Sequence, residues 1–268
     1  MLEIKDCTMR FGGLTCVDKL NAFVGENELV GMIGPNGAGK TTVFNIITGV
    51  YNPTEGDVSF IGTSVIPFKP YQVAALGISR TFQNIRLFSG MSVRDNIRVS
   101  FVKNLRTGYF KSILQFNSYI SEEKEIDKRT DELLEIFGLL DAGDEEFARS
   151  LPYGEQRKVE IVRALATFPK LLLLDEPAAG MNPTEKVELM NLIKMVKDKF
   201  NISILLIEHD MKVVMGVCER ILVLDYGKKI AEGKPEEIKN DPKVIEAYLG
   251  GNALGIWNLG FRIWNLVD

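Results

Sequence analysis

The 268-residue sequence predicts an α/β protein with a mostly parallel sheet, an N-terminal antiparallel β part and an inserted helical subdomain. Three observations predict this class. Short apolar runs alternate with helical patterns on both sides of a long middle stretch. One run, residues 170–174, contains four consecutive leucines, which is typical of a strand buried on both faces of a parallel sheet. Between residues 84 and 150 no strand pattern is found.

The elements before residue 84 follow from apolar runs and from turn residues. A Pro-Thr-Glu-Gly turn at 53–56 precedes one strand, and Gly77 ends one helix. Strands are expected over residues 2–5, 29–33, 58–61 and 78–82, and helices over 40–50 and 71–75.

The middle stretch contains a charged segment with a helical pattern. Ser121 is expected to cap the helix, with Glu122 and Glu123 in its first turn, where the helix dipole favours acids. The alternative is a solvated amphipathic helix, but the α/β pattern resumes afterwards, which favours an inserted helical subdomain. The apolar residues at helical spacing are Ile126, Leu133, Phe137 and Leu140.

The last part of the chain again alternates strands and helices. A turn over 225–228 predicts a late antiparallel hairpin, and Pro235 and Pro242 each begin a short helix. The expected strands are 170–174, 203–207 and 220–224, and the expected helices are 157–166, 184–197 and 211–217. The buried stripe of the helix over 184–197 is expected at Val187, Met190, Ile193 and Val196.

Composition excludes several classes of protein. A net charge of −4 and a pI near 5.4 disfavour a broad nucleic-acid-binding face. The three cysteines, Cys7, Cys16 and Cys218, are odd in number and far apart, which favours buried thiols in a reducing compartment. We expect no signal peptide, and no apolar run approaches the roughly 18 residues that a membrane span needs.

Residues 34–42 fit the phosphate-loop (P-loop) pattern G-x-x-x-x-G-K-[ST], between an expected strand and an expected helix. Backbone N–H groups and the positive end of the helix dipole favour phosphate, whereas a glycine-rich turn without a ligand is the alternative. Lys40 is expected to reach the β- and γ-phosphates, and Thr41 to bind Mg²⁺. The residues expected to hold ATP are Gly34, Pro35, Asn36, Gly37, Ala38, Gly39, Lys40, Thr41 and Thr42.

Two carboxylates follow the strand with four leucines. Asp175 is expected to hold magnesium through water, and Glu176 to orient the attacking water as a general base. The alternative is a surface turn with solvated acids. It fits poorly, because ligands of open α/β sheets bind at the carboxyl ends of the strands. This core is therefore expected to be that of a P-loop nucleoside triphosphatase.

Two further segments add to this site. His209, the only histidine in the chain, follows the strand over 203–207. A lone histidine is usually a structural polar residue, but this one ends a strand of the same sheet as Asp175, which favours a functional role. The segment Leu-Pro-Tyr-Gly-Glu-Gln at 151–156 leads into a helix.

Taken together, these residues resemble the ATP-binding cassette (ABC) family over nearly the whole chain. The resemblance implies that residues 151–156 form the signature motif, and that Pro152, Gly154 and Glu155 belong to the ATP site. The family commonly has serine where Pro152 stands, so we expect the Gly154 N–H and the helix dipole to make the anion contact, with weaker ATP-driven dimerisation.

The resemblance also implies roles outside the signature motif. Gln83 would be the Q-loop glutamine, with a part in catalysis and in binding Mg²⁺, and His209 the switch histidine. Phe11 would stack on adenine; most phenylalanines are core residues, but its place ahead of the P-loop favours stacking. Residues 179–183 would form the D-loop that meets a partner subunit, and Asn182 replaces the commoner aspartate there.

Three segments narrow the resemblance to the ATPases of branched-chain (hydrophobic) amino-acid importers. They are residues 80–88, 175–183 and 207–212, and the closing Ala247-Tyr248-Leu249-Gly250 also looks like that group. The implied domains are 1–84, the first part of the ATP-binding core; 85–155, the helical subdomain with the signature motif; 156–240, the second part of the core; and 241–268, a C-terminal helix and apolar tail.

The implied protein is a peripheral ATPase subunit on the cytoplasmic face of the cell membrane. Its expected partners are permease subunits, a second ATPase subunit that is identical or paralogous, and indirectly a solute-binding protein, with no nucleic acid. The alternatives are an ABC ATPase for another cargo and a soluble ABC-type ATPase acting on ribosomes or DNA.

The tail contains both tryptophans, Trp257 and Trp264, in two Ile-Trp-Asn-Leu repeats. A docking surface for a membrane, a permease or another partner chain is one interpretation. A tail folded on its own domain, or a non-native extension, is the other.

Overall fold

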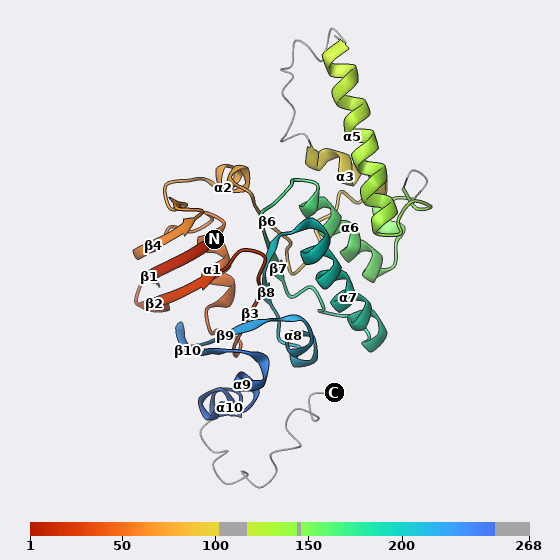
Figure 1. Ribbon diagram of the computed structural model, residues 1–268. Coiled ribbons are helices and arrows are strands. Elements are labelled where there is room, and N and C mark those ends of the chain that lie inside the picture. The colour runs from red at the N-terminus through yellow and green to blue at the C-terminus, as the bar shows by residue number, and fades with distance from the viewer. Residues whose placement is uncertain (102–116, 144–145, 250–268) are drawn as a thin grey trace. The chain divides into compact units, whose positions relative to one another are not determined.

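The computed structural model describes residues 1–101, 117–143 and 146–249, which form two compact units (Figure 1). The first unit contains Met1–Leu76 and Leu173–Asp268, and the second contains Gly77–Leu172. The domain divisions expected after residues 84, 155 and 240 stay predictions. The two tryptophans of the tail lie outside the described residues.

The first unit contains an antiparallel sheet of strands in the order β2-β1-β4-β5, which confirms the predicted N-terminal antiparallel part. Its strands are β1 (Leu2–Phe11), β2 (Leu14–Val24), β4 (Glu55–Phe60) and β5 (Thr63–Ser64). The sequence predicted only the start of β1 and missed β2. Asp6 and Lys19 have φ of 44° and 46°, and the β1–β2 register shifts along the pair. Such irregularities interrupt the period of two by which a strand is recognised.

The second sheet is mostly parallel, as predicted. Within the first unit its order is β10-β9-β3-β8-β7. β3 pairs in parallel with both β8 and β9, and β10 closes the predicted antiparallel hairpin with β9. Every residue of β3, β8 and β7 is buried, as expected of strands covered on both faces. The strands are β3 (Leu29–Ile33), β7 (Leu171–Asp175), β8 (Ser203–Ile207), β9 (Arg220–Asp225) and β10 (Lys228–Gly233).

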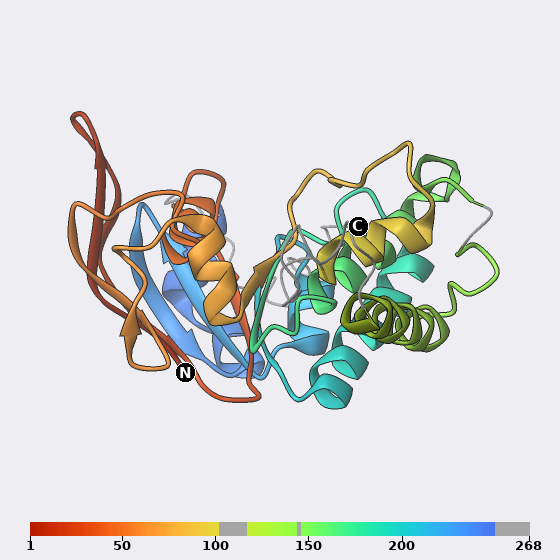
Figure 2. The ribbon, with the colours of Figure 1, turned by 90° about the horizontal axis from the view of Figure 1, so that it is seen from above.

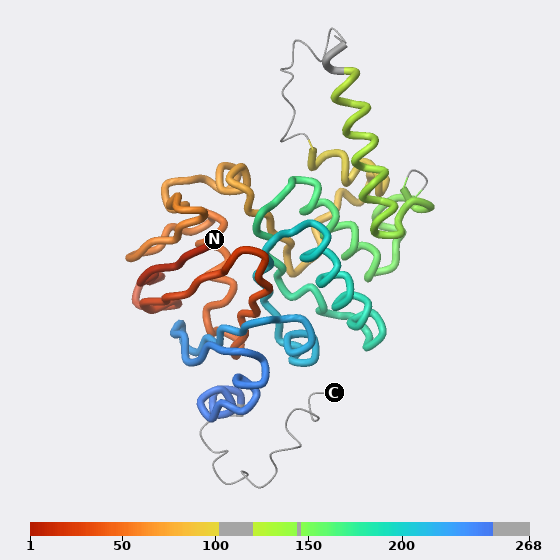
Figure 3. Tube along the Cα trace, viewed as in Figure 1, coloured from red at the N-terminus to blue at the C-terminus, as the bar shows by residue number. Residues whose placement is uncertain are grey.

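The helices of the first unit follow its strands. Figure 3 shows the chain passing from β10 into two short helices, each of which begins at the predicted proline. They are α1 (Lys40–Ile47), α2 (Pro70–Leu76), α7 (Pro183–Phe200), α8 (Met211–Val217), α9 (Pro235–Lys239) and α10 (Pro242–Leu249).

The expected buried stripe of α7 is partly wrong. Val187 is 56% exposed, and Leu189 is buried with Ile193 and Val196. Two residues turn a helix by about 200°, so a stripe through Leu189 leaves Val187 on the opposite face. Met190 is only partly buried.

In the second unit, α3 crosses the long α5 and contacts both α5 and α6 (Figure 2). Apart from β7 at the boundary, β6 is its one strand in the described residues. Its elements are β6 (Ile78–Arg80), α3 (Val93–Phe101), α5 (Asn117–Ile136), a 3-10 helix (Ala148–Ser150) and α6 (Tyr153–Leu165).

Two expectations for α5 are wrong. Ser121 is not the N-cap, because the helix already includes Asn117. Leu140 is 48% exposed, because α5 ends at Ile136 and the chain turns at Gly138, so Leu139 is buried instead. Leu133 and Phe137 are buried as predicted.

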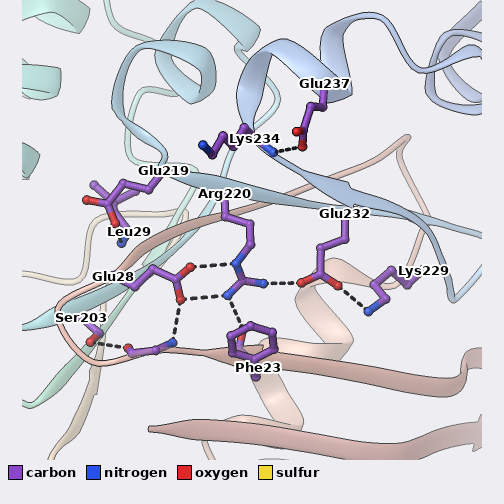
Figure 4. A network of polar contacts seen from close by, with 11 residues as sticks. Phe23, Glu28, Leu29, Ser203, Glu219, Arg220, Lys229, Glu232, Lys234 and Glu237 are labelled. Carbon is purple, nitrogen blue, oxygen red and sulfur yellow. Dashed lines mark hydrogen bonds and ion pairs between the residues drawn. The ribbon is translucent and has the colours of Figure 1, made fainter.

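A polar network joins the two sheets of the first unit (Figure 4). Arg220 of β9 donates to both carboxylate oxygens of Glu28 at 2.7 and 2.8 Å, to Glu232 of β10 at 2.5 Å and to the Phe23 carbonyl of β2 at 2.9 Å. The guanidinium also lies 4.0 Å from the centre of the Phe23 ring. Burial acts to raise the pKa of Glu28, but hydrogen bonds from Arg220 and Gly25 and the Arg220 charge outweigh burial and lower it.

In the described parts of the chain, no helix is long and apolar enough to cross a membrane. Cys7 and Cys218 are buried free thiols, as predicted, whereas Cys16 is partly exposed.

Candidate nucleotide-binding and hydrolysis site

The P-loop joins the end of β3 to the start of α1, in the predicted strand-loop-helix context. Two of its glycines are required by close approaches of the backbone. A Cβ on Gly34, whose φ is 150°, would lie 2.0 Å from the Leu224 carbonyl oxygen. One on Gly39, whose φ is 99°, would lie 2.4 Å from the Cys16 carbonyl oxygen. The loop is therefore seated on β9 and β2 in a conformation that larger residues would disrupt.

Lys40 reaches back over the loop from the first position of α1. Its side chain is buried, and Nζ donates to the carbonyls of Gly34 at 2.6 Å and Pro35 at 3.0 Å. Burial lowers the pKa of Lys40, while the negative charges of Glu176 and Asp175 act to raise it. When a nucleotide binds, an ammonium group in this position can bond to phosphate oxygens in place of the two carbonyl oxygens.

The two predicted acids lie at the end of β7. Asp175 is 4% exposed. Glu176 has a φ of 46°, which is uncommon for a residue other than glycine, and its N–H donates to the Ile207 carbonyl of β8 at 2.9 Å. This bond fixes the turn that carries Glu176 to the end of the neighbouring strand.

His209 follows β8 and is mostly exposed, with 59% of its side chain accessible. Its Nδ1 lies 3.7 Å from Glu176 Oε2, a separation at which the imidazole and the carboxylate face each other without a direct hydrogen bond. Because β8 lies between β3 and β7, the ends of three strands bring together the P-loop, the two acids and the histidine.

The predicted magnesium ligands of the first unit are the Thr41 hydroxyl and the Asp175 carboxylate. Thr41 is exposed at the first turn of α1, and the charge of Asp175 acts on the neighbouring Lys40. Hydroxyl and carboxylate oxygens suit Mg²⁺, which uses few protein ligands together with phosphates and water. The donor set therefore fits the ion.

Phe11 lies at the end of β1 with its ring 42% exposed. It meets Tyr51 edge-on, with 5.2 Å between the ring centres. An exposed ring is what adenine stacking needs, and the role of Phe11 stays a prediction.

The signature segment of the second unit leads into α6. Pro152 is the N-cap residue, with φ of −53° and no side-chain hydrogen bond to the helix, so Gly154 and Glu155 lie in the first turn. The Gln156 side chain instead donates to the Leu151 carbonyl at 2.9 Å. First-turn N–H groups point out of the helix and remain available for an anion.

Gln83 is exposed in the same unit, and its carbonyl is held by a residue that sequence reasoning missed. Arg157 is fully buried and donates to the carbonyls of Gln83 at 2.8 Å and Phe82 at 2.7 Å. It also donates to Glu160 at 2.6 Å. An arginine two residues after the glutamate of the motif is expected to be a surface charge, so no sequence pattern indicates its burial.

Two further residues that contact the P-loop or His209 were not predicted to belong to the site. Glu208 is fully buried beside His209, and an acid that continues a buried strand is the signal for it. Tyr248 of α10 accepts a hydrogen bond from the Gly34 N–H, and burial raises the pKa of its hydroxyl to about 12. The sequence placed Tyr248 in a segment typical of the importer ATPases, but it did not predict this contact.

Comparison with protein families gives two matches. The family model described as "ABC transporter" matches residues 17–179. The model described as "Branched-chain amino acid ATP-binding cassette transporter" matches residues 228–253.

Curated relatives match along almost their full length. The chain is 45% identical over 250 residues to the high-affinity branched-chain amino acid transport ATP-binding protein LivG of Salmonella typhimurium, covering 93% of this chain and 98% of LivG. It is 42% identical over 250 residues to the corresponding protein BraF of Pseudomonas aeruginosa, with the same coverage.

Solved structures match the fold. The ADP conformation of MJ1267, an ATP-binding cassette of an ABC transporter, has a TM-score of 0.80 and 31% identity, covering 93% of this chain and 98% of MJ1267. A dimeric post-hydrolysis state of the cassette MJ0796, bound to ADP and Pi, has a TM-score of 0.73 and 25% identity, covering 88% of this chain and 99% of MJ0796.

Proposed function

This chain belongs to the ABC transporter family, and we propose that it is the ATP-hydrolysing subunit of an importer for branched-chain or other hydrophobic amino acids. The observation that carries the ATPase assignment is the meeting of Lys40, Asp175, Glu176 and His209 at the ends of β3, β7 and β8. The match over residues 228–253 and the role of the relatives LivG and BraF in branched-chain amino acid transport support the cargo.

In the proposed reaction the P-loop N–H groups and Lys40 hold the β- and γ-phosphates. Thr41, Asp175 and Gln83 would hold Mg²⁺, which neutralises phosphate charge when bound. Glu176 orients the attacking water and accepts its proton, and His209 approaches the γ-phosphate from the neighbouring strand end. Phe11 stacks on adenine.

The proposed assembly contains two ATPase chains placed head to tail. Each ATP would lie between the P-loop of one chain and Pro152, Gly154 and Glu155 of the other, and the dimeric MJ0796 cassette supports a pair of this kind. Permease subunits would contact the second unit and deliver cargo from a solute-binding protein. In this assembly the chain would lie at the cytoplasmic face of the membrane.

The test of the ATPase assignment is Glu176→Gln, which keeps the shape of the side chain and removes its basicity. A general base contributes about 10²- to 10⁴-fold, so kcat should fall by about that factor while ATP binding persists. Size-exclusion chromatography should then show a dimer that accumulates with ATP. Glu188→Gln, the same change at an exposed position of α7, is the control. Wild-type turnover by Glu176→Gln contradicts the proposed role.

The cargo has a separate test. The native complex is purified with its permease subunits, placed in vesicles and assayed for ATP-driven uptake of leucine. Uptake of another substrate class, with none of leucine, supports the alternative of a different cargo. Co-purification with ribosomes or DNA in place of permeases supports the remaining alternative, which the net charge of −4 disfavours.

A further inference from the structure

Glu208 is a buried carboxylate that accepts three backbone hydrogen bonds. The Ala178 N–H donates to Oε1 at 2.7 Å. The N–H groups of His209 and Asp210 donate to Oε2 at 3.1 and 3.4 Å. The side chain has no solvent-exposed area. One carboxylate therefore ties the segment after β7 to the segment after β8.

The bond to Ala178 is one of two that pin the turn carrying Glu176. The Glu176 N–H bonds to the last residue of β8, and two residues later Ala178 bonds to Glu208. Two attachment points hold a turn in one orientation, whereas one point leaves it free to rotate. Glu176 is the first of these two points, and its carboxylate faces His209.

Glu208 also acts on His209 directly. Its Oε2 lies 3.9 Å from His209 Nδ1, while the backbone N–H of the same histidine bonds to that oxygen. Burial raises the pKa of Glu208, and its hydrogen bonds and the His209 charge oppose this rise. The geometry places one carboxylate in contact with the backbone of both segments that carry the proposed hydrolytic pair.

We propose that Glu208 is a positioning residue for ATP hydrolysis: its carboxylate holds Glu176 and His209 in register across the ends of β7 and β8. This inference rests on the proposed function. The Glu208 side chain is fully buried, and in this proposal it acts only through these two residues. Glutamine cannot replace it, because a carboxylate offers two acceptor oxygens while an amide offers one and turns its NH₂ group toward a backbone donor.

The central measurement compares Glu208→Gln with Glu219→Gln. Glu219 also accepts a backbone hydrogen bond, from Leu29 at the opposite end of β3, and so undergoes the same chemical change away from the site. A misplacement of about 1 Å lowers turnover by about 100-fold, so kcat of Glu208→Gln should fall by about 10- to 100-fold. KM for ATP should stay within about threefold, because the P-loop is untouched. Glu219→Gln should keep wild-type kcat.

Two readouts separate positioning from a general loss of stability. In a Glu176→Gln/His209→Ala background, Glu208→Gln should lower the residual rate no further, because both residues through which it acts are missing. His209 is the single histidine of the chain, so one imidazole resonance reports on it by NMR. That resonance should move in Glu208→Gln and stay in place in Glu219→Gln.

If Glu208→Gln does not fold, Glu208→Asp provides a second test of the proposal. It keeps the charge and shortens the reach to Ala178, so kcat should again fall at unchanged KM. Wild-type kcat in a folded Glu208→Gln or Glu208→Asp overturns the proposal, as does a further loss of rate in the Glu176→Gln/His209→Ala background. If Glu176→Gln itself turns over at the wild-type rate, the proposed function fails instead.

Discussion

Pro152 changes what the start of α6 can offer to an anion. Serine at a helix N-cap accepts a hydrogen bond from the first turn and carries a hydroxyl that can donate to phosphate. Pro152 does neither, and the structure shows no side-chain cap at this helix. In the proposed assembly, the N–H of Gly154 and the helix dipole are the groups left to meet the γ-phosphate of an ATP held by the partner chain.

We therefore predict that Pro152→Ser strengthens ATP-driven dimerisation. A hydrogen bond to a charged group contributes about 1.5–3 kcal/mol, so dimer affinity in a Glu176→Gln background should rise by roughly 10- to 100-fold. Analytical ultracentrifugation with ATP measures the change. Pro235→Ser, at the first turn of α9, is the control. Unchanged dimer affinity together with an unchanged ATPase rate contradicts the role given to Gly154.

Asn182 fills a structural role that aspartate would also fill. Its side chain accepts from the Glu185 N–H at 3.0 Å, and its own N–H donates to Glu185 at 2.9 Å, which forms a capping box at the start of α7. Asparagine and aspartate are equally good N-caps. The departure from the family pattern therefore leaves the start of α7 intact.

Among the elements, β9 and β10 depend on Arg220. This arginine bonds to groups before β3, in β2 and in β10, so it joins both sheets of the first unit. A bidentate pair with a carboxylate is stronger than most surface ion pairs. Its main partner Glu28 has a lowered pKa, which makes this contribution dependent on pH.

Arg220→Met should destabilise the first unit at neutral pH and do so less in acid. The folded pKa of Glu28 lies below its unfolded value of about 4.3, so the pair stabilises above that value. The stabilisation is lost as the pH falls through the folded pKa. Urea unfolding at pH 7, 5, 4 and 3 should show a difference from wild type that is constant down to pH 5 and shrinks below it. If the difference in stability does not change with pH, it comes from the lost packing of Arg220 on Phe23 and not from the ion pair with Glu28.

The sequence predicted the strands that are buried along their whole length and the helices that begin at a proline. β3, β7 and β8 are buried throughout, and Pro235 and Pro242 begin α9 and α10. β2 was missed because irregular pairing breaks its period, and the stripe of α7 was placed one face away at Val187. A local sequence pattern does not determine where strand pairing becomes irregular or which face of a helix is buried.

The same limit applies to the site. The P-loop, Asp175, Glu176 and His209 were predicted as site residues because each lies in a short motif or at a strand end. Arg157 and Glu208 were not assigned roles, since their partners lie far along the chain at Gln83 and Ala178. Charged residues are expected at the surface, and only folding reveals that these two are buried.

At the scale of the whole molecule, magnesium should be needed for turnover and not for the fold. Its proposed protein ligands are Thr41, Asp175 and Gln83, and the remaining ligands are phosphate and water. EDTA should lower ATP turnover by at least about 100-fold, and Mg²⁺ should restore it. The Tm without nucleotide should not change. A fall in Tm with EDTA alone would reveal a structural ion.

The pairing of β3 with β8 and β9 has a consequence for how the chain is made. Leu29 pairs with Ile204, and the whole second unit lies between them in the sequence. A ribosome adding about 5–20 residues per second needs roughly nine to thirty-five seconds to reach the partner strand. During that time an apolar strand, already followed by its P-loop, leaves its hydrogen-bonding edges uncovered. The newborn chain is then open to aggregation, and the second unit has time to fold before the first can close its sheet.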